Sequence, residues 1–136
     1  MVEKAIYAVL STEPEVTSIV SNRSFPVVAD QDAALPFIAV SRKSTDRKHT
    51  LSGESHNLPV ALMHLTCWAT THQAARDLAD VLLQVFDGLS GTHGGVEVHK
   101  TFIEDEFDGF DFLTDGKEKP AYSITVALRV WYREPA

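Results

Sequence analysis

Six histidines and one cysteine are the side chains in this sequence that could bind a transition metal or act as a nucleophile. The histidines are His49, His56, His64, His72, His93 and His99. None has the four-residue helical spacing of a zinc protease, and Cys67 has no second cysteine with which to complete a zinc site. Cys67 also stands in the middle of a predicted strand beside Met63 and Leu65, where a thiol is buried and unreactive. We therefore expect no metal centre, no nucleophilic cysteine, and histidines that are solvated or singly hydrogen-bonded.

Carboxylates are concentrated in one segment in the last third of the chain. They are Glu104, Asp105, Glu106, Asp108, Asp111 and Asp115. Such side chains can bind calcium or transfer protons, but their spacing does not match the calcium loop of an EF-hand. Phe107, Phe110 and Phe112 are interleaved with them. We predict a long acidic loop after about Phe107, whose phenylalanines either close over the protein's own core or dock on another subunit.

A second polar connection, residues 43–58, is locally basic in an otherwise acidic protein. Together with the residue before it, it supplies the cations Arg42, Lys43, Arg47 and Lys48. Long connections of this kind are often functional. Neither a glycine-rich phosphate loop nor the G-x-S-x-G motif of a nucleophilic serine occurs in the sequence. We therefore predict a protein with no enzymatic activity and no cofactor.

The composition limits the class of protein. The chain has 136 residues, a formal net charge of −7, 44% hydrophobic residues and 23% charged residues. These values are typical of one soluble globular domain, which we place at residues 1–136. The negative charge disfavours general binding to nucleic acid or to an anionic membrane, and no apolar run is long enough to span a bilayer. The single cysteine excludes an internal disulfide, and the first residues do not follow the pattern of a signal peptide.

Apolar periodicity predicts the elements that position these side chains. A helical hairpin is expected over about residues 2–11 and 14–21, and a long helix follows Thr70-Thr71 and ends near Leu89. Strands are expected at about 37–42, 60–69, 96–107 and 122–133. The predicted fold is α+β, an antiparallel or mixed sheet of about four strands with the N-terminal helical hairpin and the long helix packed on one face. Exposed sheet edges are expected at 37–42 or at the C-terminal strand.

The order of these segments resembles the phage tail completion or tail terminator family, the head–tail joining proteins of long-tailed phages. The resemblance runs in order from EKAIYAVLSTEPEVTSIV through DQDAALPFIAVSRKS and LTCWATTHQAARDLADVLLQVFDGLSG to GGVEVHKTFIEDEFD and YSITVALRVWYRE. Its clearest parts are Leu35 to Val40, the strand-to-helix joint at Cys67 to Leu89, and the closing ITVALRVWYRE. The chain departs from the family mainly in the loop after Phe107.

The resemblance implies a structural subunit that forms a ring, typically hexameric, on the head-proximal end of the tail tube. Such a ring stops tube growth and presents a surface to the head connector. We predict that part of the acidic segment 104–115 lines the bore, where its charge keeps passing DNA from binding. The cations at positions 42, 43, 47 and 48 are predicted to face a protein partner, the tail-tube protein or the head-connector protein. Trp131 lies on the polar side of the last strand, so we expect a neighbouring subunit to cover it.

The resemblance also implies a location at the head-proximal end of the virion tail, after assembly in the host cytoplasm, with no membrane partner. Three alternatives remain open at the level of the sequence. A connector-side head–tail adaptor would bind the portal end instead of the tube end. An unrelated small α+β binding module would be a monomer or dimer with an apolar pocket. A metal-dependent hydrolase would purify with stoichiometric metal.

Overall fold

The computed structural model describes residues 2–20, 24–26, 36–46, 59–112 and 120–133. In chain order its elements are α1 (Glu3–Thr12), α2 (Pro14–Val20), β1 (Ser24–Pro26), β2 (Phe37–Asp46), β3 (Val60–Ala69), α3 (His72–Phe86), β4 (Gly91–His93), β5 (Val96–Phe112) and β6 (Pro120–Arg133). The predicted helical hairpin corresponds to α1 and α2, and the predicted long helix corresponds to α3. Arg47, Lys48 and Asp115 lie outside the described residues.

The described strands form one six-stranded sheet in the order β1-β2-β3-β6-β5-β4. β1 pairs in parallel with β2, and the other neighbouring pairs are antiparallel, so the sheet is mixed. The predicted α+β class is confirmed, although the sheet has two strands more than the periodicity suggested. The additional strands, β1 and β4, have three residues each. They are too short for an alternating pattern to reveal them in the sequence.

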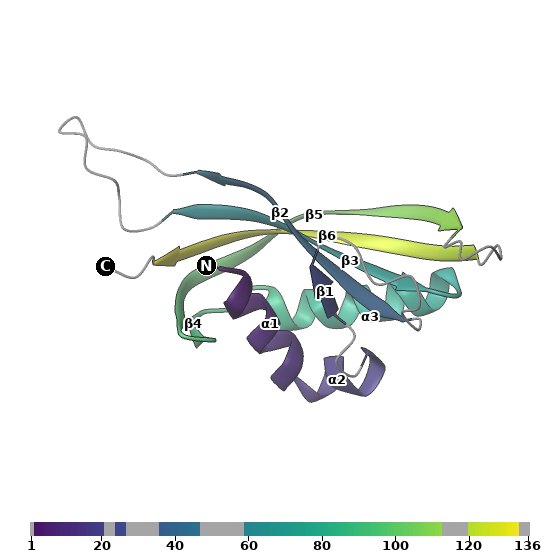
Figure 1. The fold of residues 1–136 in the computed structure, drawn as a ribbon, viewed down its shortest axis with the longest axis horizontal. Coiled ribbons are helices and arrows are strands. Elements are labelled where there is room, and N and C mark those ends of the chain that lie inside the picture. Colours follow the sequence, from purple (N-terminus) through teal and green to yellow (C-terminus); the bar gives the residue numbers. More distant parts are fainter. Residues whose placement is uncertain (1, 21–23, 27–35, 47–58, 113–119, 134–136) are drawn as a thin grey trace.

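The three helices lie on the same side of the sheet (Figure 1). Thr71 caps the start of α3, since its hydroxyl accepts a hydrogen bond from the backbone N–H of Ala74 at 3.1 Å. The apolar stripe of α3 is buried, mainly against β6 and β3, and consists of Ala75, Leu78, Ala79, Leu82 and Phe86. Burying a leucine or phenylalanine contributes about 1.5–3 kcal/mol, so this packing holds the helix to the sheet. No helix in the described part of the chain has both the length and the apolar character needed to cross a membrane.

The turn between β4 and β5 brings the far end of the sheet against α1. Gly94 and Gly95 have φ angles of 57° and 78°, in the left-handed region that favours glycine. A Cβ atom on Gly94 would lie 2.5 Å from the carbonyl oxygen of Lys4 in α1, whereas one on Gly95 would meet nothing within 4 Å. Gly94 is therefore required both by its conformation and by the close approach of α1.

The two faces of the sheet have different surroundings. On β3, the side chains that point toward the helices are fully buried, whereas the alternate side chains are only half-buried. We call the face away from the helices the open face, since no helix lies over it in Figure 1. On the central strands β3 and β6 it carries Val60, Leu62, His64, Thr66, Trp68, Ser123, Thr125, Ala127, Arg129, Trp131 and Arg133.

The acidic segment is a strand as far as Phe112, so the predicted loop after Phe107 is wrong for these residues. β5 pairs with β6 from Glu97 opposite Arg133 to Phe112 opposite Pro120. Aspartate and glycine have low strand propensity, but the strongly alternating β6 supplies a partner that overrides it. β2 is likewise longer than predicted and continues to Asp46.

Exposed edges were expected at residues 37–42 or at the C-terminal strand, and the second of these expectations is wrong. β6 lies between β3 and β5, so the C-terminal strand is central and is not an edge. The long apolar alternation of β6 fits this central position, because β6 pairs along most of its length with both β3 and β5. On the other side of the sheet, β1 covers β2 only from Ile38 to Val40.

Candidate functional site

The residues that could serve contacts with partners are placed by the pairing of β5 and β6. Successive side chains of a strand point to opposite faces, so the carboxylates of β5 are divided between the two faces of the sheet. Glu106 and Asp108 pair with Val126 and Ile124, which belong to the buried core, and they point toward α3. Asp105 pairs with Ala127 and points to the open face. The six predicted acids are thus not one surface.

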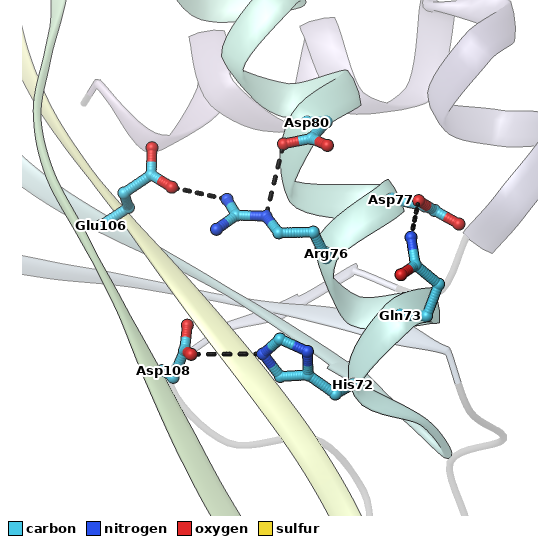
Figure 2. Close-up of polar contacts among 7 residues, drawn as sticks. All are labelled: His72, Gln73, Arg76, Asp77, Asp80, Glu106 and Asp108. Atoms are coloured by element: carbon cyan, nitrogen blue, oxygen red, sulfur yellow. Dashed lines mark hydrogen bonds and ion pairs between the residues drawn. The ribbon is translucent and has the colours of Figure 1, made fainter.

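An ion pair and a histidine–carboxylate contact join the acidic strand to the long helix (Figure 2). The Arg76 guanidinium donates from Nη2 to Glu106 Oε1 at 2.6 Å, and its Nε lies 3.3 Å from Asp80 Oδ1. The hydrogen bond that Arg76 donates to Glu106 is the main reason that the pKa of Arg76 is raised. His72 Nε2 lies 3.2 Å from Asp108 Oδ2. Glu106 and Asp108 therefore serve the contact between α3 and β5.

The sequence does contain a signal for this contact, in the spacing of residues on each of the two elements. His72 and Arg76 are four residues apart on α3, so they share one face of the helix. Glu106 and Asp108 are two residues apart on β5, so they share one face of the strand. Placing the residues after about Phe107 in a loop concealed the second spacing, because a loop has no fixed side-chain period.

The open face near β5 combines aromatic and charged side chains. Phe102 and Phe107 are 47% and 46% exposed, which is unusual for phenylalanines on a sheet. The Glu104 carboxylate accepts a hydrogen bond from Arg129. Asp105 Oδ1 accepts one from the backbone N–H of Glu106 at 2.8 Å, and among the described residues no cation forms an ion pair with Asp105. The open face thus offers both apolar surface and negative charge.

His64 lies beside this aromatic surface. Its ring meets the Phe107 ring edge-on, with centroids 5.6 Å apart. Partial burial lowers the pKa of His64, and the positive charge of Lys43 lowers it further, whereas Glu104 and Asp105 act in the opposite direction. His64 is therefore predominantly neutral at pH 7, and it joins the apolar part of the open face.

The predicted basic residues do not form one patch in the described structure. Arg42 points toward the helices, where it forms an ion pair with Glu3 of α1 and donates from Nη1 to Thr45 Oγ1 at 3.2 Å. Lys43 is exposed at an irregularity of β2, between the paired residues Arg42 and Ser44. Lys43 is thus the described cation of this group that is available to a partner.

Trp131 lies on the open face, as its place in the alternation of β6 predicted. It is half-buried, between Val60 of β3 and Lys100 of β5 in the strand register. None of the described helices lies over this face. Trp131, which was predicted to lie at an interface, and Asp105, which was predicted to line the bore, belong to the same face of the sheet.

The groups that could carry chemistry are dispersed. Cys67 is fully buried, and burial raises the pKa of its thiol, so the reactive thiolate is strongly disfavoured. Its predicted position inside the core is confirmed. Over residues 2–20, 24–26, 36–46, 59–112 and 120–133, no three histidine, cysteine or acidic side chains are grouped as metal ligands would be.

Comparisons with known proteins identify the fold and the family of the chain. The chain shares its fold with a chain of the solved structure "Virion of native gene transfer agent (GTA) particle". The TM-score is 0.75 at 10% sequence identity, over 96% of this chain and 92% of that chain. No curated protein matches the sequence. The family model described as "Tail completion protein gp17" matches residues 4–133, from the second residue of α1 to the end of β6. The chain therefore belongs to the tail completion protein gp17 family.

Proposed function

We propose that this chain is a non-enzymatic structural subunit that forms a ring, closes the head-proximal end of the tail tube and offers a docking surface to the head. Membership of a tail completion family supports a structural role in a phage tail. The observation that carries the proposal is the open face, on which two phenylalanines are nearly half exposed and above which none of the helices α1 to α3 lies. Apolar side chains grouped in this way mark surfaces that contact other proteins.

The physical requirement on a tail terminator is asymmetry. A tube that grows by repeated addition of one subunit presents an unfilled heterologous interface at its end. A terminator matches that end with one surface and presents a different surface on the other side. The two faces of this sheet differ in this sense, since helices cover one and aromatic and charged side chains form the other. Such a role needs shape and charge complementarity, and it needs no cofactor.

The part of the open face around Trp131 is proposed as a contact between subunits or with a tail partner. Replacing Trp131 by alanine removes a large half-buried ring and should weaken assembly more than it lowers the stability of the protomer. Sedimentation and thermal unfolding measure the two effects separately. Gln84→Ala, on the exposed side of α3, is the control. Unchanged sedimentation with a lowered melting temperature would assign Trp131 to the fold and not to a contact.

The bore is proposed to be lined by carboxylates of β5 on the open face, Glu104 and Asp105. Their negative charge would let DNA pass without binding, because it repels the phosphates. Asp111, whose backbone belongs to β5, and Asp115 remain candidates from the sequence alone. Glu106 and Asp108 contribute only to the overall negative field, since they bind Arg76 and His72. An electron microscopy map of the ring that places Glu104 and Asp105 on its outer rim would reject this assignment.

Deleting the gene in the phage tests the proposed function directly. The expected phenotype is tails of irregular length that are not joined to filled heads, with rescue by the wild-type gene. Tails of normal length joined to filled heads would overturn the proposal. A pull-down with the isolated tail-tube protein and, separately, the head-connector protein then identifies which partner the ring binds, and binding to the connector alone would favour the adaptor role.

A further inference from the structure

Both sides of the sheet carry a strand whose outer edge is open over part of its length. β4 pairs with β5 only from Val96 to Val98, and no other described strand pairs with the outer side of β5, so 99–112 is open. β1 pairs with β2 only from Ile38 to Val40, which leaves 41–46 open in the same sense among the described strands. Unpaired N–H and C=O groups along such edges favour pairing with a strand of another chain.

The directions of the strands determine which edges can pair in a ring. β2, β3, β6 and β5 are joined by three antiparallel pairings, so β2 and β5 run in opposite directions. If a second copy is placed beside the first in the same orientation, its β2 therefore meets β5 as an antiparallel strand. This head-to-tail contact joins two different edges, and repetition of it around an axis closes a ring.

The charges of the two edges favour the head-to-tail contact over contacts between identical edges. β5 carries Glu104, Asp105, Glu106 and Asp108 along its open stretch. Pairing β5 with β5 of another copy would set these carboxylates against each other, which is destabilising. On the open stretch of β2 the exposed cation is Lys43, since Arg42 is paired with Glu3 of α1.

We propose that copies of this chain join edge to edge, with residues 41–46 of β2 in one copy pairing antiparallel with β5 of the next copy within 99–112. The proposal rests on the ring of the preceding subsection and specifies how its subunits meet. Backbone hydrogen bonds provide the attachment, and the opposite charges of the two edges select the partner edge. Side chains stand perpendicular to the sheet, so Glu104 and Asp105 remain on the open face after the edges have paired.

Charged side chains and strand irregularities can also protect an edge from pairing. The irregularities of β5 lie between Val98 and Lys100 and between Ile103 and Asp105. From Asp105 to Phe112 the pairing with β6 is regular, so this stretch presents an undistorted outer edge. Charges of either sign on both edges would protect the protein from aggregation. The charges on β2 and β5 have opposite signs, so they permit these two unlike edges to meet.

Reversing charges on the two edges tests the proposal. Lys43→Glu and Asp105→Lys should each weaken self-association of the full chain about tenfold, because each places like charges across the contact. A mixture of the two variants should associate more tightly than either variant alone, since Glu and Lys then meet across one contact. The double variant in one chain should regain association close to that of the wild type. Analytical ultracentrifugation over a concentration series measures all four.

Each alternative gives a different result. Stronger association of Asp105→Lys alone would show pairing of β5 with β5, and stronger association of Lys43→Glu alone would show pairing of β2 with β2; either overturns the proposal. Rings that form unchanged in all variants would overturn the edge contact and leave the proposed function intact. A wild-type chain that stays monomeric up to its solubility limit would overturn edge pairing for the isolated chain, while the deletion phage still tests the function.

Two controls complete the experiment. Asp87→Lys makes the same charge change as Asp105→Lys at an exposed position beyond the end of α3, and it should leave association unchanged. Circular dichroism and thermal unfolding establish that each variant is folded. Association of the wild type should also weaken as salt is added, because salt screens attraction between opposite charges. Association that strengthens with salt would indicate contact between like-charged edges and would contradict the proposal.

Discussion

The two faces of the sheet can be compared along a single strand, β6. Ile124, Leu128 and Val130 are fully buried beneath the helices. Their neighbours on the open face have no helix above them, and the largest of them, Arg129 and Trp131, reach solvent. The face toward the helices is therefore an apolar core that stabilises the fold, whereas the open face is a surface on which side chains can change at small cost to stability.

Small residues on the open face are shielded from solvent by neighbouring strands and not by helices. Thr125 is 7% exposed although it lies on the face opposite the described helices. Its hydroxyl lies 3.1 Å from that of Thr66 on the adjacent strand. Contacts between neighbouring strands thus stabilise this face, and each such pair contributes only about 0.2–1 kcal/mol. The comparison indicates that substitutions on the two faces should differ in both size and kind of effect.

The largest difference is expected between Leu128→Ala and Arg129→Ala, adjacent residues on opposite faces. Leu128→Ala leaves a cavity in the core and should lower the free energy of unfolding by about 2–5 kcal/mol. Arg129→Ala removes an exposed ion pair with Glu104 and should change it by less than about 1 kcal/mol. Urea denaturation measures both. Equal losses would mean that the open face contributes to the core.

A smaller effect is expected at the turn that brings β4 against α1. Gly95→Ala should cost about 1–2 kcal/mol, because alanine is strained at positive φ. Gly94→Ala has the same strain, and its Cβ also collides with the Lys4 carbonyl, so its loss should be larger. Chemical denaturation of the two variants checks this order. Equal stability of both would show that α1 moves away without cost.

The contact between α3 and β5 extends the comparison to two ion pairs made from the same strand. Arg76→Met should lower the free energy of unfolding by about 0.5–1 kcal/mol, as expected for a partly exposed pair. Glu106→Gln should cause little additional loss in the Arg76→Met background, since the two side chains act together. Glu104→Gln, which affects the pair on the open face, is the control. Additive losses at Arg76 and Glu106 would contradict the interaction.

The smallest effect concerns pH and the open face. The pKa of His64 is lowered in the folded protein, chiefly by burial, so the folded state binds fewer protons than the unfolded state near the ordinary pKa of about 6.5. The contribution of neutral His64 to stability is therefore present above that pH and decreases as the pH falls toward the lowered value. His64→Gln should reduce the loss of stability between pH 7.5 and pH 5.5 by a small amount. Urea denaturation measures the free energy of unfolding of both proteins across this pH range. If its pH dependence is identical in both, the His64 side chain is fully solvated in the folded protein.

The sequence was sufficient for the elements with a long and regular apolar pattern. The stripe of α3, the alternation of β6 and the burial of Cys67 follow from local spacing, because each element has to bury one face. The α+β class follows from the order of these elements. Family membership was also anticipated from the sequence, and the match over residues 4–133 confirms it.

Contacts between residues far apart in the chain were decided only by the tertiary structure. β6 makes a strand of the acidic segment through Phe112, and the register then sends Glu106 toward Arg76 and Asp105 to the open face. Arg42 binds Glu3 of α1, which lies 39 positions earlier in the chain. Local periodicity cannot specify such pairs, because a strand of low intrinsic propensity forms only when its neighbour is in place, and a one-residue shift in register would exchange its faces.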